Sequence, residues 1–329
     1  MIWAENSKKA VDFFMKDKKI VVIGGGTGLS TMLRGLRMHT HNITAVVTVA
    51  DDGGSSGILR SDMGMLPPGD VRNCICALSD TDPILSELLS FRFDEGSLKG
   101  HSLGNIILAA LNEMSDNFEE AVGKLNQIMG VIGKVYPVTN ESVILRAILE
   151  DGTVINGESQ IGSYRDGKNK GISELHIVPE NPKPVDGVIK AIGEADIIVL
   201  GPGSLYTSII PNLLVEGVTE AIHKSDAKKV YVCNIMTQPG ETDGYTVSDH
   251  LRAIEKHSYE GIADAVIVNR SPLPQELAER YAAEHAYQVK DDTDKINNKM
   301  ITVYGDLLLM NNDKIRHNFS RLARTIVLL

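Results

Sequence analysis

The residues best suited to chemistry form a glycine run that directly follows a short β-branched stretch. The run consists of Gly24, Gly25, Gly26, Thr27 and Gly28. Glycines let a backbone turn sharply and approach an anion closely. The first turn of a following helix offers unpaired N–H groups and the positive end of the helix dipole. The pattern therefore predicts a phosphate-binding turn, and its alternative is a tight strand-to-helix turn without a ligand.

The glycine run meets the dinucleotide fingerprint G-x-G-x-x-G only in part. Gly24 and Gly26 match it, but Leu29 stands where the last glycine belongs. The sequence therefore does not favour NAD, and an NAD-dependent oxidoreductase is the least favoured function of those considered.

Two adjacent acids open the loop DDGGSSG, which follows a second β-branched stretch. Asp51 and Asp52 are followed there by Gly53, Gly54 and Ser55. An acid at this position can accept hydrogen bonds from a ribose hydroxyl, and two neighbouring carboxylates can hold a divalent cation beside phosphates. All five residues therefore belong to the candidate site, with Asp51 and Asp52 as candidate metal ligands. A solvated helix cap is the alternative.

Two further motifs, PPGDVRN and GHSLGN, add polar side chains to the candidate site. In the first, Asp70 can cap a helix and Arg72 can pair with a phosphate, with Asn73 beside them. In the second, His101 can act as a general acid or base near neutral pH or pack before a helix, and Asn105 follows it. No companion acid stands at a telling spacing from His101, so a Ser-His-Asp hydrolase is not predicted.

The second half of the chain again places polar, glycine-rich loops after buried strands. Two such loops, GPGSLYTS and MTQPGETDGY, offer hydroxyl, amide and carboxylate groups that suit the recognition of a base or a sugar. Helix capping is the alternative role for the hydroxyls. The candidate ligand-binding residues in these loops are Gly201, Gly203, Ser204, Thr237, Gln238, Glu241, Thr242 and Tyr245.

The elements that must position these motifs alternate between buried strands and helices. Strands are expected at residues 19–23, 43–49, 196–200, 229–234 and 263–268, and helices at residues 29–38, 67–93 with a break at Pro83, 101–128, 185–194, 213–224 and 247–257. This alternation predicts a three-layer α/β/α Rossmann-like sandwich with a mainly parallel sheet, in which ligands bind at the carboxyl ends of the strands. A small β-hairpin insertion is expected at about residues 143–178, because Asp151 and Gly152 separate two strand-like runs.

Length and composition limit the remaining possibilities. The 329 residues suffice for one large domain, which we place at residues 18–329 behind an N-terminal extension of residues 1–17. The net charge is −10 without a basic stripe, so nucleic acid is not an expected partner. Cys74, Cys76 and Cys233 form an odd, sparse set that fits a reducing compartment. With no expected secretion signal and no expected membrane span, a cytoplasmic protein is predicted.

Taken in order, the motifs resemble the family shared by the 2-phospho-lactate transferase of deazaflavin cofactor biosynthesis and the bacterial YvcK-type gluconeogenesis factors. The stretches that carry this CofD-like resemblance are IGGGTG, TVADDGGSSG, PPGDVRN, GHSLGN, LGPGSLYTS and NIMTQPGETDGY. MTQPGETDGY and KIRHN are more similar to the gluconeogenesis factors than to the transferases.

The resemblance implies a protein that binds UDP-activated amino sugars such as UDP-N-acetylglucosamine. It also implies a role in cell shape and cell-wall precursor supply during growth on gluconeogenic carbon. Tyr281 in LAERYAAE and Arg316 in KIRHN are the implied contacts to the uridine or the diphosphate. Phe319 stands where related chains can carry a phosphorylatable Thr, so regulation at that position is not expected, although Ser320 is adjacent.

Two functions from different classes remain open after these observations. The favoured one is a nucleotide-sugar-binding regulator without strong catalysis. The other is a Mg²⁺-dependent transferase that uses a nucleotide diphosphate-linked donor, for which Asp51, Asp52 and Asp70 could supply metal ligands. A homodimer and protein partners in cell-wall synthesis or its regulation are expected by analogy only.

Overall fold

Seven parallel strands form the central sheet of the described chain. Across the sheet they are β10 (Ile301–Gly305), β9 (Ala265–Asn269), β8 (Lys228–Val232), β7 (Ile197–Leu200), β1 (Ile20–Gly24), β2 (Ile43–Val47) and β3 (Lys134–Pro137). Every neighbouring pair is parallel. The computed structural model describes residues 18–164, 170–297, 299–311 and 314–329. The predicted α/β class with a mainly parallel sheet is confirmed.

The strands in the middle of the sheet follow from their composition. All five residues of β1 and all four of β7 are buried, because a parallel strand covered on both faces must be apolar on both. The two edge strands, β3 and β10, were not predicted. In β3 exposed and buried residues mix and a proline ends the strand, and β10 has no fully buried residue, so neither shows the signal of a buried strand.

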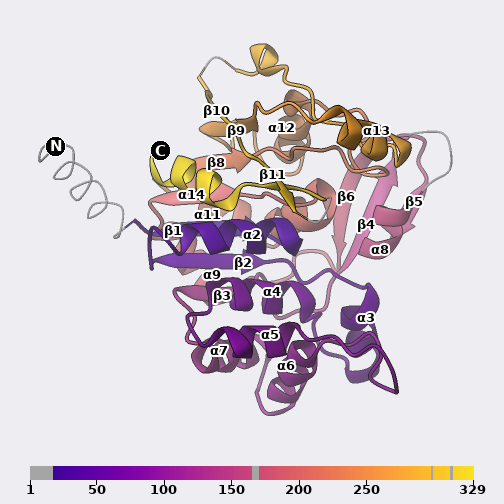
Figure 1. The fold of residues 1–329 in the computed structure, drawn as a ribbon, viewed down its shortest axis with the longest axis vertical. Helices are drawn as coiled ribbons and strands as arrows, with labels where there is room; N and C mark the ends of the chain where they lie inside the picture. Colours follow the sequence, from indigo (N-terminus) through magenta and orange to yellow (C-terminus); the bar gives the residue numbers. More distant parts are fainter. Residues whose placement is uncertain (1–17, 165–169, 298, 312–313) are drawn as a thin grey trace, which may run out of the picture.

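Helices cover both faces of the sheet. Figure 1 shows α2 (Gly26–Leu36), α4 (Gly69–Leu78) and α14 (Phe319–Val327) on the near face, with α9 (Asp186–Gly193) and α11 (Val218–Lys224) behind it. The last helix, α14, packs closely on α2 because Gly35 leaves room for the backbone of Phe319. The predicted three layers are therefore present.

Three helix boundaries differ from those expected. The remaining helices of the described chain are α3 (Gly54–Met63), α5 (Pro83–Ser90), α6 (Leu103–Glu113), α7 (Phe118–Ile128), α8 (Glu158–Ser163), α10 (Ile210–Leu213), α12 (Val247–Lys256) and α13 (Gln275–Ala283), with short π and 3₁₀ turns at Leu205–Ile209 and Thr293–Lys295. The single helix expected at 101–128 is two, because Asn117 caps a new start. Helix α3 begins inside the expected loop 51–57, and α2 begins at Gly26, before Leu29.

Two small antiparallel sheets complete the described fold. The hairpin expected near Asp151 forms between β4 (Ile144–Leu149) and β5 (Val154–Asn156), and β6 (Ile172–Val178) adds a third strand to it. A second hairpin, β11 (Leu308–Asn311) with β12 (Lys314–His317), was not predicted. The N-terminal extension 1–17 and residues 165–169 of the expected polar loop lie outside the described residues.

The strand order places a topological switch point between β1 and β7. From β1 the chain passes through α2 to β2 on one side, whereas β7 lies on the other side of β1 and leads on to β8 and β9. Connections that diverge in this way leave a crevice outside the carboxyl ends of the two strands, where ligands of open α/β sheets bind. Within the part of the chain that the structure describes, no helix is both long and apolar enough to cross a bilayer.

Candidate functional site

The two glycine-rich turns that follow β1 and β7 are packed against each other. A Cβ atom on Gly28 would lie 2.7 Å from the carbonyl oxygen of Pro202, and one on Gly203 would lie 3.2 Å from the carbonyl oxygen of Gly25. Neither glycine can therefore carry a side chain without moving backbone. The glycine run thus has a packing role in addition to any ligand, and the two turns form one continuous wall at the switch point.

The first turn of α2 presents backbone N–H groups at this wall. Its N-cap, Gly25, is extended and supplies no side-chain cap, and the turn carries no acid of its own. The N–H of Gly26 is taken by Asp70, whose Oδ2 lies 2.7 Å away. Thr27 and Gly28 also belong to this turn, whose N–H groups have no carbonyl one turn earlier to bond within the helix, so the turn suits an anion.

A cavity of about 410 Å³ opens on this wall. That volume lies within the usual range for small-ligand sites, about 300–1,000 Å³. The predicted residues that line it are Gly25, Gly26, Thr27, Gly28, Gly203, Ser204, Thr237, Gln238, Tyr281 and Arg316. Residues from five separate stretches of sequence therefore meet at the carboxyl edge of the sheet. Gly24 and Gly201 support the wall from the ends of β1 and β7 without lining the cavity.

Another part of the cavity lining comes from α13 and from β12 of the second hairpin. Tyr281 and Arg316 line the cavity together with Ile315 and His317. His317 was not predicted; burial lowers its pKa to about 4, opposed by a 3.2 Å contact of Nε2 with the carbonyl oxygen of Cys233. It is therefore neutral at pH 7 and donates to that carbonyl. Arg316 is then the cationic side chain of this wall.

The loop after β8 supplies the polar floor of the cavity. Gln238 Nε2 donates to Ser204 Oγ at 2.8 Å, and Asn234 Nδ2 donates to the carbonyl oxygen of Gly203 at 2.7 Å. Thr237 Oγ1 accepts from the backbone N–H of Tyr287 at 2.9 Å. The bonds of Gln238 and Asn234 connect the loop to the second glycine turn, and that of Thr237 connects it to the segment after α13. Asn234 lies in a motif that the sequence singled out but was not itself chosen as a site residue.

Three predicted residues of the same loop face the protein interior instead of the cavity. Glu241 accepts from the N–H of Tyr206 at 3.2 Å, and the hydroxyl of Thr242 accepts from the N–H of Gln238 at 2.8 Å. The hydroxyls of Tyr245 and Tyr206 lie 2.8 Å apart. In this structure these side chains hold the loop against the π turn after β7. Polar side chains after a strand look alike in sequence whether they face a ligand or the fold.

Several acidic side chains cluster around Asp70, next to the cavity. Burial raises the pKa of Asp70 to about 6, with Asp51 adding to the shift and the Gly26 N–H opposing it. Glu158, on α8 of the insertion, was not predicted. Burial and then the charges of Asp51, Glu241, Asp52 and Asp70 raise its pKa to about 8. No sequence signal pointed to Glu158, because only the docking of the insertion brings it to these acids.

Asp52 and Arg72 serve neighbouring elements. Asp52 accepts from the backbone N–H groups of Glu158 and Ser159 at 3.1 and 2.8 Å, which fixes the start of α8. Arg72 is buried and donates to the carbonyl oxygen of Leu89 and to Asn73 Oδ1. Neither side chain lines the cavity. The expected phosphate contact of Arg72 therefore has no support in this arrangement, and burial lowers the pKa of its guanidinium.

The remaining predicted residues gather at the first turns of α3 and α6. Gly53 and Gly54 form the start of α3, where the N–H of Gly53 donates to Asp51 Oδ1 at 2.9 Å. Ser55 Oγ lies 3.0 Å from His101 Nδ1, and Asn105 Nδ2 donates to Ser55 Oγ at 3.1 Å. Sequence spacing gave no hint of this contact, because 46 residues separate Ser55 from His101.

Comparison with known proteins assigns the chain to a family. The family model described as 2-phospho-L-lactate transferase CofD matches residues 20–309. The chain belongs to the CofD family. This membership confirms the resemblance that the six motifs carry, although the structure places PPGDVRN and GHSLGN after helices α3 and α5 and not after strands.

Members of the CofD family with high identity are named gluconeogenesis factors. A putative gluconeogenesis factor of Thermoanaerobacterium thermosulfurigenes is 52% identical, over 95% of this chain and 97% of its own length. The gluconeogenesis factor of Bacillus subtilis is 46% identical, over 94% of this chain and 97% of its own. A crystal structure of a UPF0052 family member from Bacillus halodurans matches with a TM-score of 0.90 at 46% identity, covering 94% of this chain and 99% of that one.

The acids of this CofD family chain offer few ligands for a metal ion. Among the described residues, no three His, Cys, Asp or Glu side chains are placed to hold one ion together. Asp51 and Asp70 are neighbours. Gly69 directly precedes Asp70, and a Cβ atom added to Gly69 would lie 3.4 Å from Asp51 Oδ2. Mg²⁺ commonly takes one or two carboxylates and completes its shell with water and substrate phosphates. Asp51 and Asp70 fit that kind of site, whereas Asp52 is engaged with α8.

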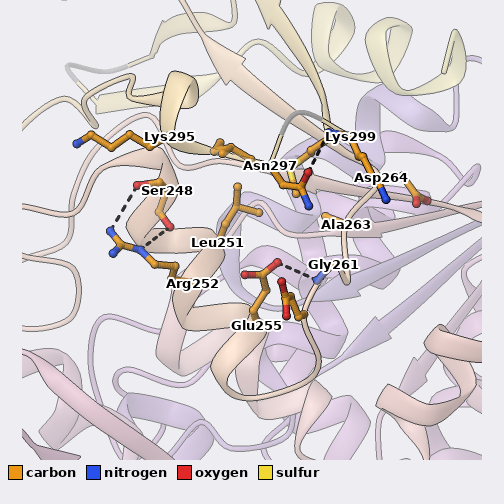
Figure 2. A pocket seen from close by; sticks show the side chains of 13 residues that line it. Ser248, Leu251, Arg252, Glu255, Gly261, Ala263, Asp264, Lys295, Asn297 and Lys299 are labelled. Carbon is orange, nitrogen blue, oxygen red and sulfur yellow. Dashed lines mark hydrogen bonds between the residues drawn. The ribbon is translucent and has the colours of Figure 1, made fainter.

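A second cavity of similar size, about 430 Å³, lies at the opposite edge of the sheet. Figure 2 shows its lining from α12 and from the segments that directly precede β9 and β10, including Glu255, which accepts from the N–H of Gly261 at 2.9 Å. Asp264 accepts from the backbone N–H of Lys229 at 2.7 Å. No predicted residue lines it. Because ligands of open parallel sheets bind at the carboxyl ends of strands, we place the site of this CofD family chain at the first cavity.

Proposed function

We propose that this chain is a regulatory protein that binds a nucleotide sugar of the UDP-N-acetylglucosamine kind. The observation that carries the proposal is the single cavity at the switch point, which ten residues predicted from the sequence line together. Glycine-turn backbone, hydroxyl and amide side chains, an aromatic ring and one arginine suit the diphosphate, sugar and base of such a ligand.

The electrostatics of the cavity explain how an acidic chain would take an anionic ligand. The chain carries a net charge of −10, so long-range attraction does not favour a diphosphate. Local attraction comes from the first turn of α2 and from Arg316, which approach the cavity from different walls. A diphosphate held between them would gain charge-assisted hydrogen bonds from both.

The proposed role follows the names of the related proteins. The named gluconeogenesis factors cover nearly the whole chain at 46–52% identity. We therefore propose a cytoplasmic gluconeogenesis factor, needed for cell shape and for cell-wall precursor supply on gluconeogenic carbon. Its output would pass through protein partners in cell-wall synthesis or its regulation, and the protein would act as a homodimer.

Calorimetry with four ligands tests the binding proposal. UDP-N-acetylglucosamine and UDP-glucose should bind with micromolar or tighter affinity, roughly −8 kcal/mol, whereas NAD and GDP should bind more weakly. An absence of heat with both UDP-sugars, together with clear binding of NAD, would overturn the proposal. The role in cells is tested by deleting the gene and comparing cell shape on glucose with cell shape on a gluconeogenic carbon source.

A second candidate function is a Mg²⁺-dependent transferase that uses a nucleotide diphosphate-linked donor. The adjacent carboxylates of Asp51 and Asp70 favour it, because they lie beside the first turn of α2, where a donor phosphate would bind. When bound, Mg²⁺ would neutralise phosphate charge there. A turnover assay with Mg²⁺ and a range of hydroxyl acceptors tests this function. Product formation at ordinary enzymatic rates would favour it over regulation.

A further inference from the structure

The first turns of four helices are joined by hydrogen bonds into one row that begins at the cavity. The N–H of Gly26 in α2 donates to Asp70 in α4 at 2.7 Å, and the N–H of Gly69 in α4 donates to the hydroxyl of Ser56 in α3 at 3.2 Å. Ser55, the residue of α3 that precedes Ser56, accepts from Asn105 in α6 at 3.1 Å. The row therefore extends the wall of the cavity from the glycine run toward α6.

The far end of this row has a defined proton arrangement. Asn105 Nδ2 donates to Ser55 Oγ, so the single hydroxyl proton of Ser55 is free to donate to His101 Nδ1 at 3.0 Å. In the neutral imidazole the ring proton must then lie on Nε2. His101 is half-buried, and its Nε2–H is the donor that this arrangement leaves for another molecule.

Asn105 is one of three asparagines whose side-chain oxygen is buried without a partner among the described residues, with Asn126 and Asn212. Its side chain is 2% exposed, and its Oδ1 has no hydrogen-bond partner among the described residues. A buried polar atom without a partner is unfavourable, and such atoms are rare in folded proteins. The amide nonetheless sits in the first turn of α6 with its nitrogen on Ser55. The role that we assign to the Asn105 side chain is to orient the Ser55 hydroxyl toward His101.

We propose that this cluster forms the subsite for the hydroxyl-bearing glycosyl group of the ligand. His101 makes the contact, by donating Nε2–H to a sugar oxygen, and Ser55 and Asn105 position it. The nucleotide end lies in the cavity between the glycine turns and Arg316. This inference rests on the proposed function, because it assigns the sugar to one end of a row whose other end takes the diphosphate.

Calorimetry of UDP and of UDP-N-acetylglucosamine separates the two ends of the ligand. The quantity to compare is the dissociation constant of UDP divided by that of UDP-N-acetylglucosamine. This ratio measures how much affinity the sugar adds. His101→Asn keeps an acceptor near the Nδ1 position and removes Nε2–H. This variant should lower the ratio about 5- to 10-fold, as expected for one hydrogen bond, while the affinity for UDP stays unchanged.

The positioning residues have their own variants. Ser55→Ala should lower the ratio in the same direction, and Ser55→Thr, which restores a hydroxyl, should recover most of it. Ser61→Ala is the matched control, because Ser61 lies on the same helix outside the row, where its hydroxyl donates to the carbonyl oxygen of Ile58; it should leave the ratio unchanged. Melting temperatures identify any variant that is not folded.

Two results would overturn the subsite. One is an unchanged ratio in folded His101→Asn, whether or not the affinity for UDP falls, and the other is a ratio of one in the unmodified protein. In either case, binding of UDP by the unmodified protein would still support the nucleotide cavity. If the unmodified protein binds neither ligand, the proposed function fails and the subsite fails with it.

Discussion

The hydroxyl of Tyr281 accepts a hydrogen bond from the backbone N–H of Ile315, with 2.9 Å between oxygen and nitrogen. Tyr281 lies on α13, and Ile315 lies on β12, directly before Arg316. The bond therefore ties one wall element of the cavity to the backbone that carries its arginine. Because Tyr281 acts through its hydroxyl as well as its ring, the two contributions can be separated by substitution.

Tyr281→Phe should weaken binding of UDP-N-acetylglucosamine about 5-fold. The ring remains in the wall, but the loss of one hydrogen bond, worth about 1 kcal/mol, frees the backbone beside Arg316. Calorimetry measures the effect. Tyr287→Phe is the control, because that side chain is 52% exposed; equal losses in the two variants would contradict the role of the tether.

Arg316→Ala should strongly weaken nucleotide binding and leave the melting temperature of the free protein nearly unchanged. The expected loss is about 1.5 to 3 kcal/mol for a charge-assisted contact, or roughly 10- to 150-fold in affinity. The nearby Lys314 is exposed on the same strand, so Lys314→Ala should bind normally. Normal binding by the Arg316 variant would remove that residue from the site.

Glu158→Gln should alter the pH dependence of stability. The folded pKa of Glu158, about 8, is raised above its ordinary value of 4.5 by burial and then by neighbouring acids. Its favourable contribution is therefore complete below pH 4.5 and is lost as the pH rises through about 8. The variant should gain about 1 to 3 kcal/mol over the unmodified protein by pH 9, less than the full shift implies, because the side chain is only partly buried.

Urea unfolding at several pH values between 4 and 9 measures this difference. Glu120→Gln is the control, because the backbone N–H of Asp116 lowers the pKa of the exposed Glu120 carboxyl. The difference for that variant should have the opposite sign at neutral pH. A Glu158→Gln difference that does not vary with pH would contradict the assigned environment.

Gly28→Ala should destabilise the protein by about 1 to 3 kcal/mol, the usual range for an overpacked site. The new Cβ would lie 2.7 Å from the carbonyl oxygen of Pro202, which is backbone and cannot rotate away. Gly123, in α7, has no atom within 4 Å of such a Cβ, so Gly123→Ala should be neutral or stabilising by up to about 1 kcal/mol. Denaturant midpoints compare the two, and equal midpoints would exclude close packing of the turns.

The parallel core and its cavity could be predicted from the sequence because the signals are local. The buried strands β1, β2 and β7 are short apolar runs followed by loops rich in glycine or acids, and a parallel strand covered on both faces must be apolar throughout. Since the carboxyl ends of parallel strands share one edge, the loops after them had to meet. That geometric necessity brought the glycine run, Ser204 and Gln238 to one cavity.

The edge strands and the second hairpin were not predicted, because their hydrophobic patterns in the sequence are weak. In β10 no residue is fully buried, and β11 and β12 are four residues each. Arg316 was named only through family resemblance, since nothing in KIRHN by itself indicates a site. Long-range packing puts that hairpin against α13.

What the sequence determined by itself is the class of fold and the loops that gather at its functional edge. Only the tertiary structure decided which way each polar side chain faces: Gln238 reaches the cavity, whereas Glu241 and Tyr245 hold the π turn. Only the structure brought Glu158 to the acids and His101 to Ser55. The physical reason is that strand periodicity is set by neighbours in sequence, while the direction and protonation of a polar group are set by partners many residues away.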